Sequence, residues 1–214
     1  YTLNFAPFNI LEELDNNYIK LNVIDLKAQA EFNWQIFKGL KYNFTGAIRY
    51  VRSKQEHEIH ENSNMANAYR AAGNSTIREN NPYLYKDPSD PSAEPIVVLS
   101  KGGFYNTAEN LLLNYDIRNS VSFSKIWNEK HEFNALLGQQ IKYSDRQTNS
   151  NTGYGFQYDM GGTVSMNYLI MKQMIEQNFD YYSRALTYDR FAAFYANVDY
   201  TYDRRYSISG TVRY

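Results

Sequence analysis

The chain of 214 residues contains no cysteine, 5 prolines and 11 glycines. The absence of cysteine excludes disulfides and thiolate metal sites, and it suits a periplasm-facing protein. No run approaches 18 apolar residues, which excludes a transmembrane helix. An excess of one charge is also missing: the formal net charge is -1, which gives no reason to expect a nucleic-acid partner. Neither a G-x-S-x-G, a P-loop nor a dinucleotide fingerprint occurs, and we identify no catalytic residue and no cofactor site.

Aromatic residues, in contrast, are abundant, with 21 Tyr and 12 Phe. These residues favour β-strands, and tyrosine suits a boundary where one end of the ring is wet. The mean hydropathy of -0.63 is that of a polar chain. Outer-membrane barrels give the same average, because their strands alternate and their loops are long and polar.

Strict alternation predicts a first hairpin over about 22–52. From Ile24 to Ile36 the even positions are apolar and the odd positions are polar, over twice the length of an ordinary strand. Lys38-Gly39 then predicts a tight turn, and the return strand keeps the same phase to Tyr50.

Two further hairpins are predicted over about 109–143 and 190–214, with turns at 128–130 and 203–205. Between the hairpins lie two segments predicted as long extracellular loops, about 53–108 and 144–188. Each loop is expected to contain one short helix, near Met65 to Ala72 and near Leu169 to Gln177. The predicted fold class is therefore all-β: six long strands in three hairpins from a large antiparallel transmembrane β-barrel.

Charges separate the two predicted faces of these strands. The apolar face carries no charged residue, and its polar exceptions are Asn119 and Gln139. Eleven charged residues lie on the opposite face: Asp25, Lys27, Glu31, Lys41, Arg49, Asp116, Arg118, Glu132, Lys142, Asp199 and Arg213. Since a Lys or Arg at mid-bilayer costs about 2–4 kcal/mol, this pattern is expected of one face in lipid and one in water.

Aromatic residues also gather near the three short turns. They are Phe32, Trp34, Tyr42 and Phe44 at the first turn, Phe123, Trp127 and Phe133 at the second, and Tyr200, Tyr202 and Tyr206 at the third. Rings at one end of every hairpin predict an aromatic girdle at a membrane–water interface. The alternative is that they are ordinary core aromatics.

Several segments resemble the SusC/RagA family of TonB-linked outer-membrane receptors of Bacteroidetes. Residues 9–18 are similar to the N-P-L-x-x-L-x-N segment of the family, with Ile10 in place of Pro. Phe37 to Lys41 resembles its first short turn, residues 131–138 its H-x-x-N-x-L-x-G strand, and residues 206–214 its Y-x-x-x-x-T-x-R-x strand. The resemblance covers all three hairpins but not the long loops.

This resemblance implies a 22-stranded barrel with an N-terminal plug, energised by TonB, capped by a SusD-like lipoprotein and importing oligosaccharides or peptides. The plug and the TonB-contacting region are not recognisable in this sequence. Six strands are also fewer than the eight or so that a closed transmembrane barrel requires. The chain starts at Tyr1, has no signal peptide and ends at Tyr214 within a strand-like pattern, so we expect the other strands and the plug to come from further chain.

Polar clusters are interpreted as solvated surface rather than metal sites. His57 and His60, beside Glu56 and Glu61, lack a clear third ligand and are expected in a polar loop. The acidic residues near two prolines miss the spacing of a calcium loop; they are Asp87, Asp90 and Glu94. We therefore expect no metal site.

The loop aromatics are the remaining candidates for substrate contact. They are Tyr83, Tyr85, Phe104, Tyr105, Tyr154, Phe156 and Tyr158. Such rings can stack on the apolar face of a sugar, or they can pack loop against loop, which we favour.

The predicted function is thus nutrient import, as barrel wall and extracellular loops, in contact with the lipids of the outer membrane. Two alternatives remain open. One is a passive porin-like or adhesin-like barrel without TonB coupling. The other is a soluble all-β domain that binds a ligand in an apolar interior.

Overall fold

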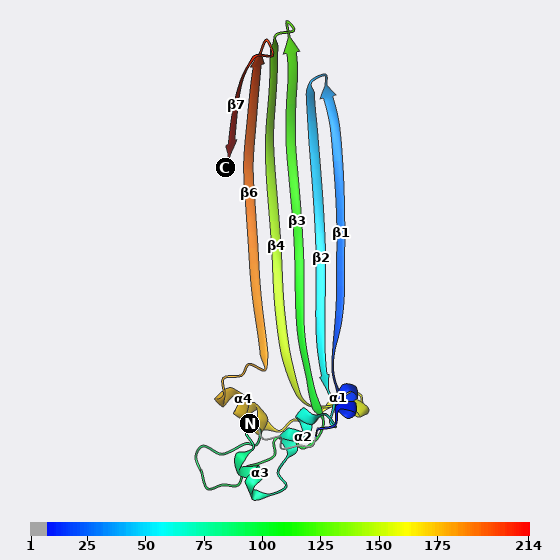
Figure 1. The fold of residues 1–214 in the computed structure, drawn as a ribbon, viewed down its shortest axis with the longest axis vertical. Helices are drawn as coiled ribbons and strands as arrows, with labels where there is room; N and C mark the ends of the chain where they lie inside the picture. The colour runs from blue at the N-terminus through cyan, green and yellow to red at the C-terminus, as the bar shows by residue number, and fades with distance from the viewer. Residues whose placement is uncertain (1–7) are drawn as a thin grey trace. The chain divides into compact units, whose positions relative to one another are not determined.

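The computed structural model describes residues 8–214; Tyr1, part of the argument for a longer chain, lies outside them. The chain forms an antiparallel sheet in which neighbours follow the order β1-β2-β3-β4-β6-β7, with the short β5 paired to β4 (Figure 1). The six long strands are β1 (Asn17–Phe37), β2 (Leu40–Ile59), β3 (Gly103–Trp127), β4 (His131–Gln157), β6 (Tyr182–Tyr202) and β7 (Tyr206–Arg213). Consecutive long strands are therefore neighbours throughout, and the predicted all-β fold is confirmed.

The three predicted hairpins are present, and their turns lie at the expected residues. Gly39 has φ +101°, in the region that a glycine enters without steric cost. The other two turns each begin with two consecutive left-handed residues that are not glycine, Asn128 and Glu129 in one and Asp203 and Arg204 in the other. Consecutive positive φ values match the right-handed twist of the flanking strands, which explains this geometry in hairpins.

The helix α1 (Ile10–Asn16) precedes β1, and three short helices lie between strands: α2 (Asn64–Arg70), α3 (Ser75–Asn80) and α4 (Tyr168–Glu176). The 3-10 turn η1 (Tyr158–Met160) and the short strand β5 (Thr163–Val164) lie between β4 and α4. The helices predicted near Met65 and Leu169 are present as α2 and α4; α3 and β5 were not predicted. Each helix begins at a side-chain cap, for example the Ser63 hydroxyl that accepts a hydrogen bond from the Ala66 amide. Among the described residues, no helix is long and apolar enough to span a membrane.

The strands extend well beyond the predicted hairpin boundaries. The segments between hairpins were predicted at about 53–108 and 144–188, whereas β2 continues to Ile59 and β4 to Gln157. In these extensions the alternation of apolar and polar residues weakens, as at His57 and Ile59 on the same strand face. The backbone ladder does not depend on side-chain polarity, so it continues where the hydrophobic pattern no longer reveals it.

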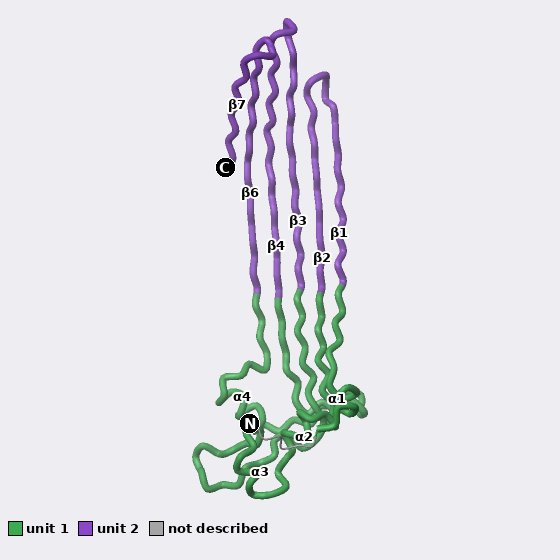
Figure 2. The backbone as a smooth tube through the Cα atoms, viewed as in Figure 1, with its two compact units in different colours: residues 1–23, 53–110, 148–185 green, residues 24–52, 111–147, 186–214 purple. Residues whose placement is uncertain are grey.

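The chain divides into two compact units (Figure 2). Unit 1 takes in the chain up to Val23, Ser53–Asn110 and Thr148–Ala185, and unit 2 comprises Ile24–Arg52, Leu111–Gln147 and Leu186–Tyr214. Of the hydrophobic residues that are buried within the described chain, all lie in unit 1 except Ala193. Unit 1 therefore has a core of its own, while unit 2 is a sheet with two open faces.

Candidate functional site

The charged face of unit 2 comprises the odd-numbered residues of β1, β2, β6 and β7 and the even-numbered residues of β3 and β4. Arg49 donates two hydrogen bonds to the carboxylate of Asp25, at 3.0 and 2.6 Å. Asp116 accepts from Arg118 at 3.1 Å and from the amide of Gln140 at 3.1 Å. All these partners are on the face to which the sequence assigned the charges. The Arg49–Asp25 and Gln140–Asp116 hydrogen bonds join neighbouring strands, and the Arg118–Asp116 pair lies within β3.

A hollow lies on this charged face, with a volume of about 330 Å³. It is lined by Lys27, Gln29, Thr45, Ala47, Ile48, Arg49, Asn114, Asp116 and Arg118. Arg49 and Arg118 are about half exposed, at 49% and 55% of their side-chain surface. The hollow therefore presents several cationic and hydrogen-bonding groups to whatever occupies the space in front of this face.

The opposite, apolar face of unit 2 is uncovered. Leu26 is 62% exposed, Trp34 54% and Val212 64%. The pairing of β6 with β7 sets Ala196 opposite Val212 on this face. These apolar side chains of unit 2 are therefore exposed and do not form a dry interior.

Asn119 is one of the two polar exceptions on the apolar face, and it has a partner there. The hydroxyl of Tyr42 donates a hydrogen bond to Oδ1 of Asn119 at 2.7 Å. The oxygen of the Asn119 amide is thereby satisfied by a protein donor and not only by water.

Aromatic rings at the second and third turns of unit 2 contact one another through His131. Nδ1 of His131 lies 2.7 Å from the hydroxyl of Tyr200, and its ring centroid lies 5.2 Å from that of Tyr202. The ring centroid of Trp127 lies 6.4 Å from the ring centroids of His131 and Phe133. The predicted cluster of rings near these turns is thus present, and His131 is a member that the sequence did not indicate.

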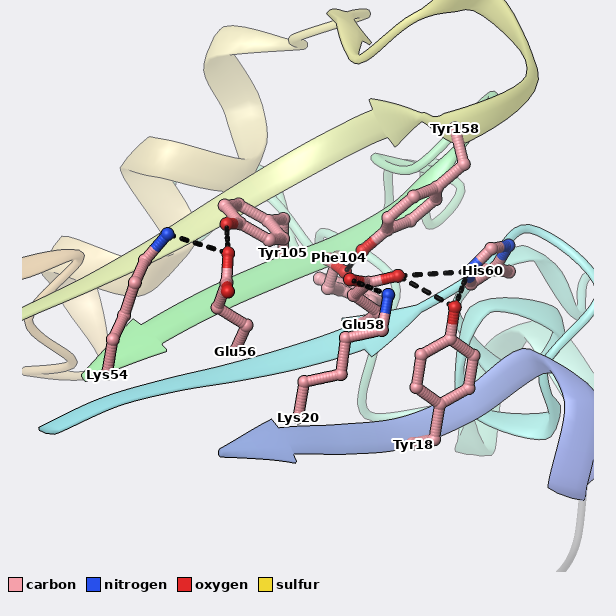
Figure 3. A network of polar contacts seen from close by, with 9 residues as sticks. All are labelled: Tyr18, Lys20, Lys54, Glu56, Glu58, His60, Phe104, Tyr105 and Tyr158. Atoms are coloured by element: carbon pink, nitrogen blue, oxygen red, sulfur yellow. Dashed lines mark hydrogen bonds and ion pairs between the residues drawn. The ribbon is translucent and has the colours of Figure 1, made fainter. Parts of the chain in front are cut away.

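In unit 1, two similar groups of polar side chains join β1, β2 and β3 (Figure 3). In the first, Glu58 accepts hydrogen bonds from the hydroxyl of Tyr18 at 2.7 Å and from the ammonium of Lys20 at 2.8 Å. In the second, Glu56 accepts from Lys54 at 2.7 Å and from the hydroxyl of Tyr105. We call these two groups the Tyr–Glu–Lys triads, and each connects β2 to a neighbouring strand.

The triads change the protonation behaviour of their carboxyl groups. Hydrogen bonds from Lys54 and Tyr105 hold the pKa of Glu56 below its ordinary value. For Glu58, burial acts to raise the pKa, but the hydrogen bonds from Lys20 and Tyr18 outweigh it and the net shift is downward. Both carboxylates are therefore stabilised in their charged form.

The two histidines of the possible metal site have separate partners. His57 Nε2 lies 2.6 Å from Oδ1 of Asn17, whereas the His60 ring stacks on Tyr158 with centroids 3.9 Å apart. His57 lies within β2 and not in the polar loop that was expected. His60 follows Ile59, the last residue of β2, and its Nε2 lies 3.2 Å from the hydroxyl of Tyr18. Among residues 8–214, no group of three or more potential ligands is placed to hold a metal ion.

The seven loop aromatics proposed for substrate contact fall into two sets. Tyr85, Phe104 and Tyr154 are buried, at 3%, 1% and 6% exposure, in the core of unit 1. Their rings contact other core residues, which agrees with packing of loop against loop. The other four rings are more accessible: Tyr83, Tyr105, Phe156 and Tyr158. Tyr83 packs on Tyr69, and Tyr105 and Tyr158 both pack on Phe156. Tyr158 also stacks on His60. Contact with a substrate stays a prediction for this second set.

The core of unit 1 fixes the loops that connect the strands. Ile59 from β2, Phe104 from β3 and Ile170 from α4 meet there, each at most 1% exposed. Tyr69 of α2 packs edge-on to Phe104, and burial raises the pKa of Tyr69 to about 12. Asn81 is fully buried, and its amide donates to the carbonyls of Ala68 and Ala71. The segments that connect the strands are therefore folded around a buried core.

The acidic segment around the prolines forms local turns. Oδ1 of Asp87 accepts from the amide and hydroxyl of Ser89, and Oδ1 of Asp90 accepts likewise from Ser92. Glu94 pairs with Arg78 at 3.0 Å. These carboxylates are engaged with neighbouring protein groups, and the segment around the prolines is a series of local turns.

Comparison with known proteins gives structural matches only. No family model matches the chain, and no curated protein does. The structure of the RagAB peptide transporter matches with a TM-score of 0.63 and 12% sequence identity over 93% of this chain. The RagAB peptide importer in the closed-closed state matches with a TM-score of 0.59 and the same identity. The chain spans 18% of the length of each matched chain.

The fold of this chain is therefore that of a segment of a β-barrel transporter. At 12% identity the likeness concerns the fold alone. It involves transporters rather than enzymes, and it agrees with the fold that the resemblance to the SusC/RagA family implied.

Proposed function

We propose that this chain is part of the wall and the extracellular loops of a SusC/RagA-like, TonB-dependent importer in the outer membrane of a Gram-negative bacterium. The observation that carries the proposal is the contrast between the two open faces of unit 2. One face is predominantly apolar and uncovered, and its charged residues lie only toward the strand ends of unit 2: Arg52, Lys125, Asp145 and Arg190. The other face carries charged residues along the middle of the strands, such as Lys27, Arg49 and Asp116. Lipid on one side and water on the other satisfy both faces at once.

The same contrast separates the proposal from a soluble binding domain. In such a domain the apolar side chains would be packed inside, whereas Leu26, Trp34 and Val212 are more than half exposed. Apolar patches of this extent are rare on soluble monomers and mark surfaces that meet a membrane or another protein. A passive pore without TonB coupling would share the same wall, so only a plug domain encoded in the same reading frame separates that alternative from the importer.

In the proposed importer the wall is passive. Its strands satisfy their backbone hydrogen bonds with one another inside the lipid, and the charged face lines the aqueous passage. Partners of the importer would be outer-membrane lipids, TonB and a SusD-like lipoprotein, and its substrates oligosaccharides or peptides. The resemblance of residues 9–18, 131–138 and 206–214 to the family and the likeness to RagAB support these assignments.

A matched pair of substitutions in β1 tests the membrane assignment. Ala30 lies in the middle of the apolar run and Gln29 is its neighbour on the charged face; both are exposed. In the full-length protein, Ala30→Arg should cost about 2–4 kcal/mol of membrane stability and sharply reduce the folded protein recovered from outer membranes. Gln29→Arg should leave that amount close to wild type. Equal recovery of the two variants would contradict the proposal, because a chain in water has no reason to distinguish two exposed neighbours.

A further inference from the structure

The hollow on the charged face of unit 2 has an imbalance of charge. Three of its lining residues are cationic, Lys27, Arg49 and Arg118, and one is anionic, Asp116. Arg49 is neutralised by Asp25 just outside the hollow. The remaining cations outnumber the carboxylates that face them.

The single negative charge of Asp116 does not neutralise the remaining cations, because several neighbouring groups already share it. Its oxygens accept from Arg118 and Gln140, and the ammonium of Lys142 lies 3.7 Å away. Lys27 is exposed and has no ion-pair partner among the described residues. One ammonium group is thus available at a site already surrounded by hydrogen-bond donors.

The rest of the lining suits a small polar ligand. Thr45 and Asn114 supply a hydroxyl and an amide, and Ala47 contributes only a methyl group to the lining. A volume of about 330 Å³ is at the lower end of the range of small-molecule pockets. Arg49 and Arg118 keep N–H donors beyond those used by Asp25 and Asp116, because a guanidinium has five.

We propose that this hollow binds a carboxylate group, with Lys27 as its main counter-charge and Arg49 and Arg118 as flanking donors. The inference rests on the proposed function, which makes this face the lining of an aqueous passage. The carboxylate belongs either to a substrate in transit or to an acidic side chain from another part of the transporter. Both sources offer the same chemistry to the hollow, and charge-assisted hydrogen bonds of this kind are among the stronger ones in proteins.

The test uses the purified full-length transporter and 4-iodobenzoate, whose iodine is located by anomalous scattering in soaked crystals and whose affinity is measured by calorimetry. An iodine peak in the hollow, with affinity about 10-fold lower in Lys27→Gln, is the result expected for a substrate-type carboxylate. Lys41 lies on the same face, is exposed and is outside the hollow, so Lys41→Gln is the matched control and should bind as wild type does.

Two other outcomes are informative. Density for an Asp or Glu side chain of the transporter within hydrogen-bond distance of Lys27 would assign the site to an internal carboxylate, and 4-iodobenzoate would then bind only after that residue is replaced by Ala. A hollow that holds neither group, or an affinity unchanged by Lys27→Gln, overturns the inference. The membrane test at Ala30 and Gln29 is independent of this result. Absence of anion binding in a correctly inserted barrel refutes the site alone, whereas equal recovery of Ala30→Arg and Gln29→Arg refutes the proposed function.

Discussion

Tyr42 and Asn119 form a hydrogen bond of 2.7 Å on the predominantly apolar face of unit 2. In the sequence, Asn119 is an interruption of the alternation on β3. In the structure, it is half of a pair whose partner lies on β2, so that the interruption needs no water. This hydrogen bond allows a polar residue to lie on a face that we propose contacts lipid.

Breaking this pair should destabilise the barrel, and removing it entirely should not. Tyr42→Phe leaves the Asn119 amide without its donor on an apolar surface, at a cost of about 1–3 kcal/mol. The double variant Tyr42→Phe/Asn119→Leu should recover most of that loss, because it removes the polar group from the apolar face along with its partner. Urea unfolding of the full-length protein in lipid vesicles measures both. A double variant less stable than Tyr42→Phe would show that the amide has another role.

The first hairpin depends on Gly39. This residue has φ +101°, and a Cβ built on it would lie 2.5 Å from the backbone carbonyl oxygen of Ser124 on β3. The Gly39 carbonyl also accepts a hydrogen bond from the Ser124 amide at 2.8 Å. Gly39→Ala should therefore cost about 2 kcal/mol or more, since both its backbone angle and its space exclude a side chain. Gly210→Ala is the control, because no atom lies within 4 Å of its Cβ position and its φ is not in that region. Similar unfolding midpoints for the two variants would refute this role of the turn.

The extent to which sequence alone predicts this structure differs between the two units. In unit 2, strict alternation from Ile24 to Ile36 and turn residues such as Gly39 determine both the strands and their faces, because each side of the sheet has a uniform environment. In unit 1, Ile59 and Phe104 are buried together although 44 residues separate them. No local pattern marks such a contact, because a core assembled from connecting segments depends on how those segments meet.

The candidate site shows the same division. The charges on the face that contains Lys27 and Arg49 follow directly from the period of two. The triads do not, because Tyr18 and Glu58 meet only once the register of β1 and β2 is known. The helix α3 was missed for a further reason: it has only six residues and no apolar face, and its start depends on the cap that Asn74 provides.

The Tyr–Glu–Lys triads should make the strand ends of unit 1 sensitive to acid. The pKa values of Glu56 and Glu58 are lower in the folded protein than their ordinary values. Their contribution to stability is therefore complete above the unfolded value of about 4.3 and is lost as the pH falls through the lower folded value. Hydrogen exchange at Tyr18 and Lys20, normalised for intrinsic rates, should be constant from pH 7 to 5 and accelerate below about pH 4.

Glu58→Gln supplies the control for this acid effect. The amide cannot titrate, so exchange at Tyr18 and Lys20 should be faster than in wild type at pH 7 and should no longer depend on pH in this range. The hairpin of β6 and β7, where Thr201 and Ser207 are joined by a neutral hydrogen bond, should show little change in either protein. Acid sensitivity that persists in Glu58→Gln would assign the effect to other groups.

Asn81 should be the residue on which the order of the connecting segment between β2 and β3 most depends. It is fully buried, its amide donates to two carbonyls near the end of α2, and its Oδ1 accepts from the amide of Tyr83 at 3.0 Å. Asn81→Ala leaves these buried backbone groups unpaired, at about 1–3 kcal/mol for each one that water cannot reach. We expect proteases to cleave this segment at least 10-fold faster in intact cells, while the amount of barrel in the membrane is unchanged. Asn80 is the matched control: it is the adjacent residue, it is exposed, and its amide donates only to the Thr76 carbonyl within its own helix. Asn80→Ala should be cleaved at nearly the wild-type rate, and equal sensitivity of the two variants would mean that burial of Asn81 contributes nothing to the order of this segment.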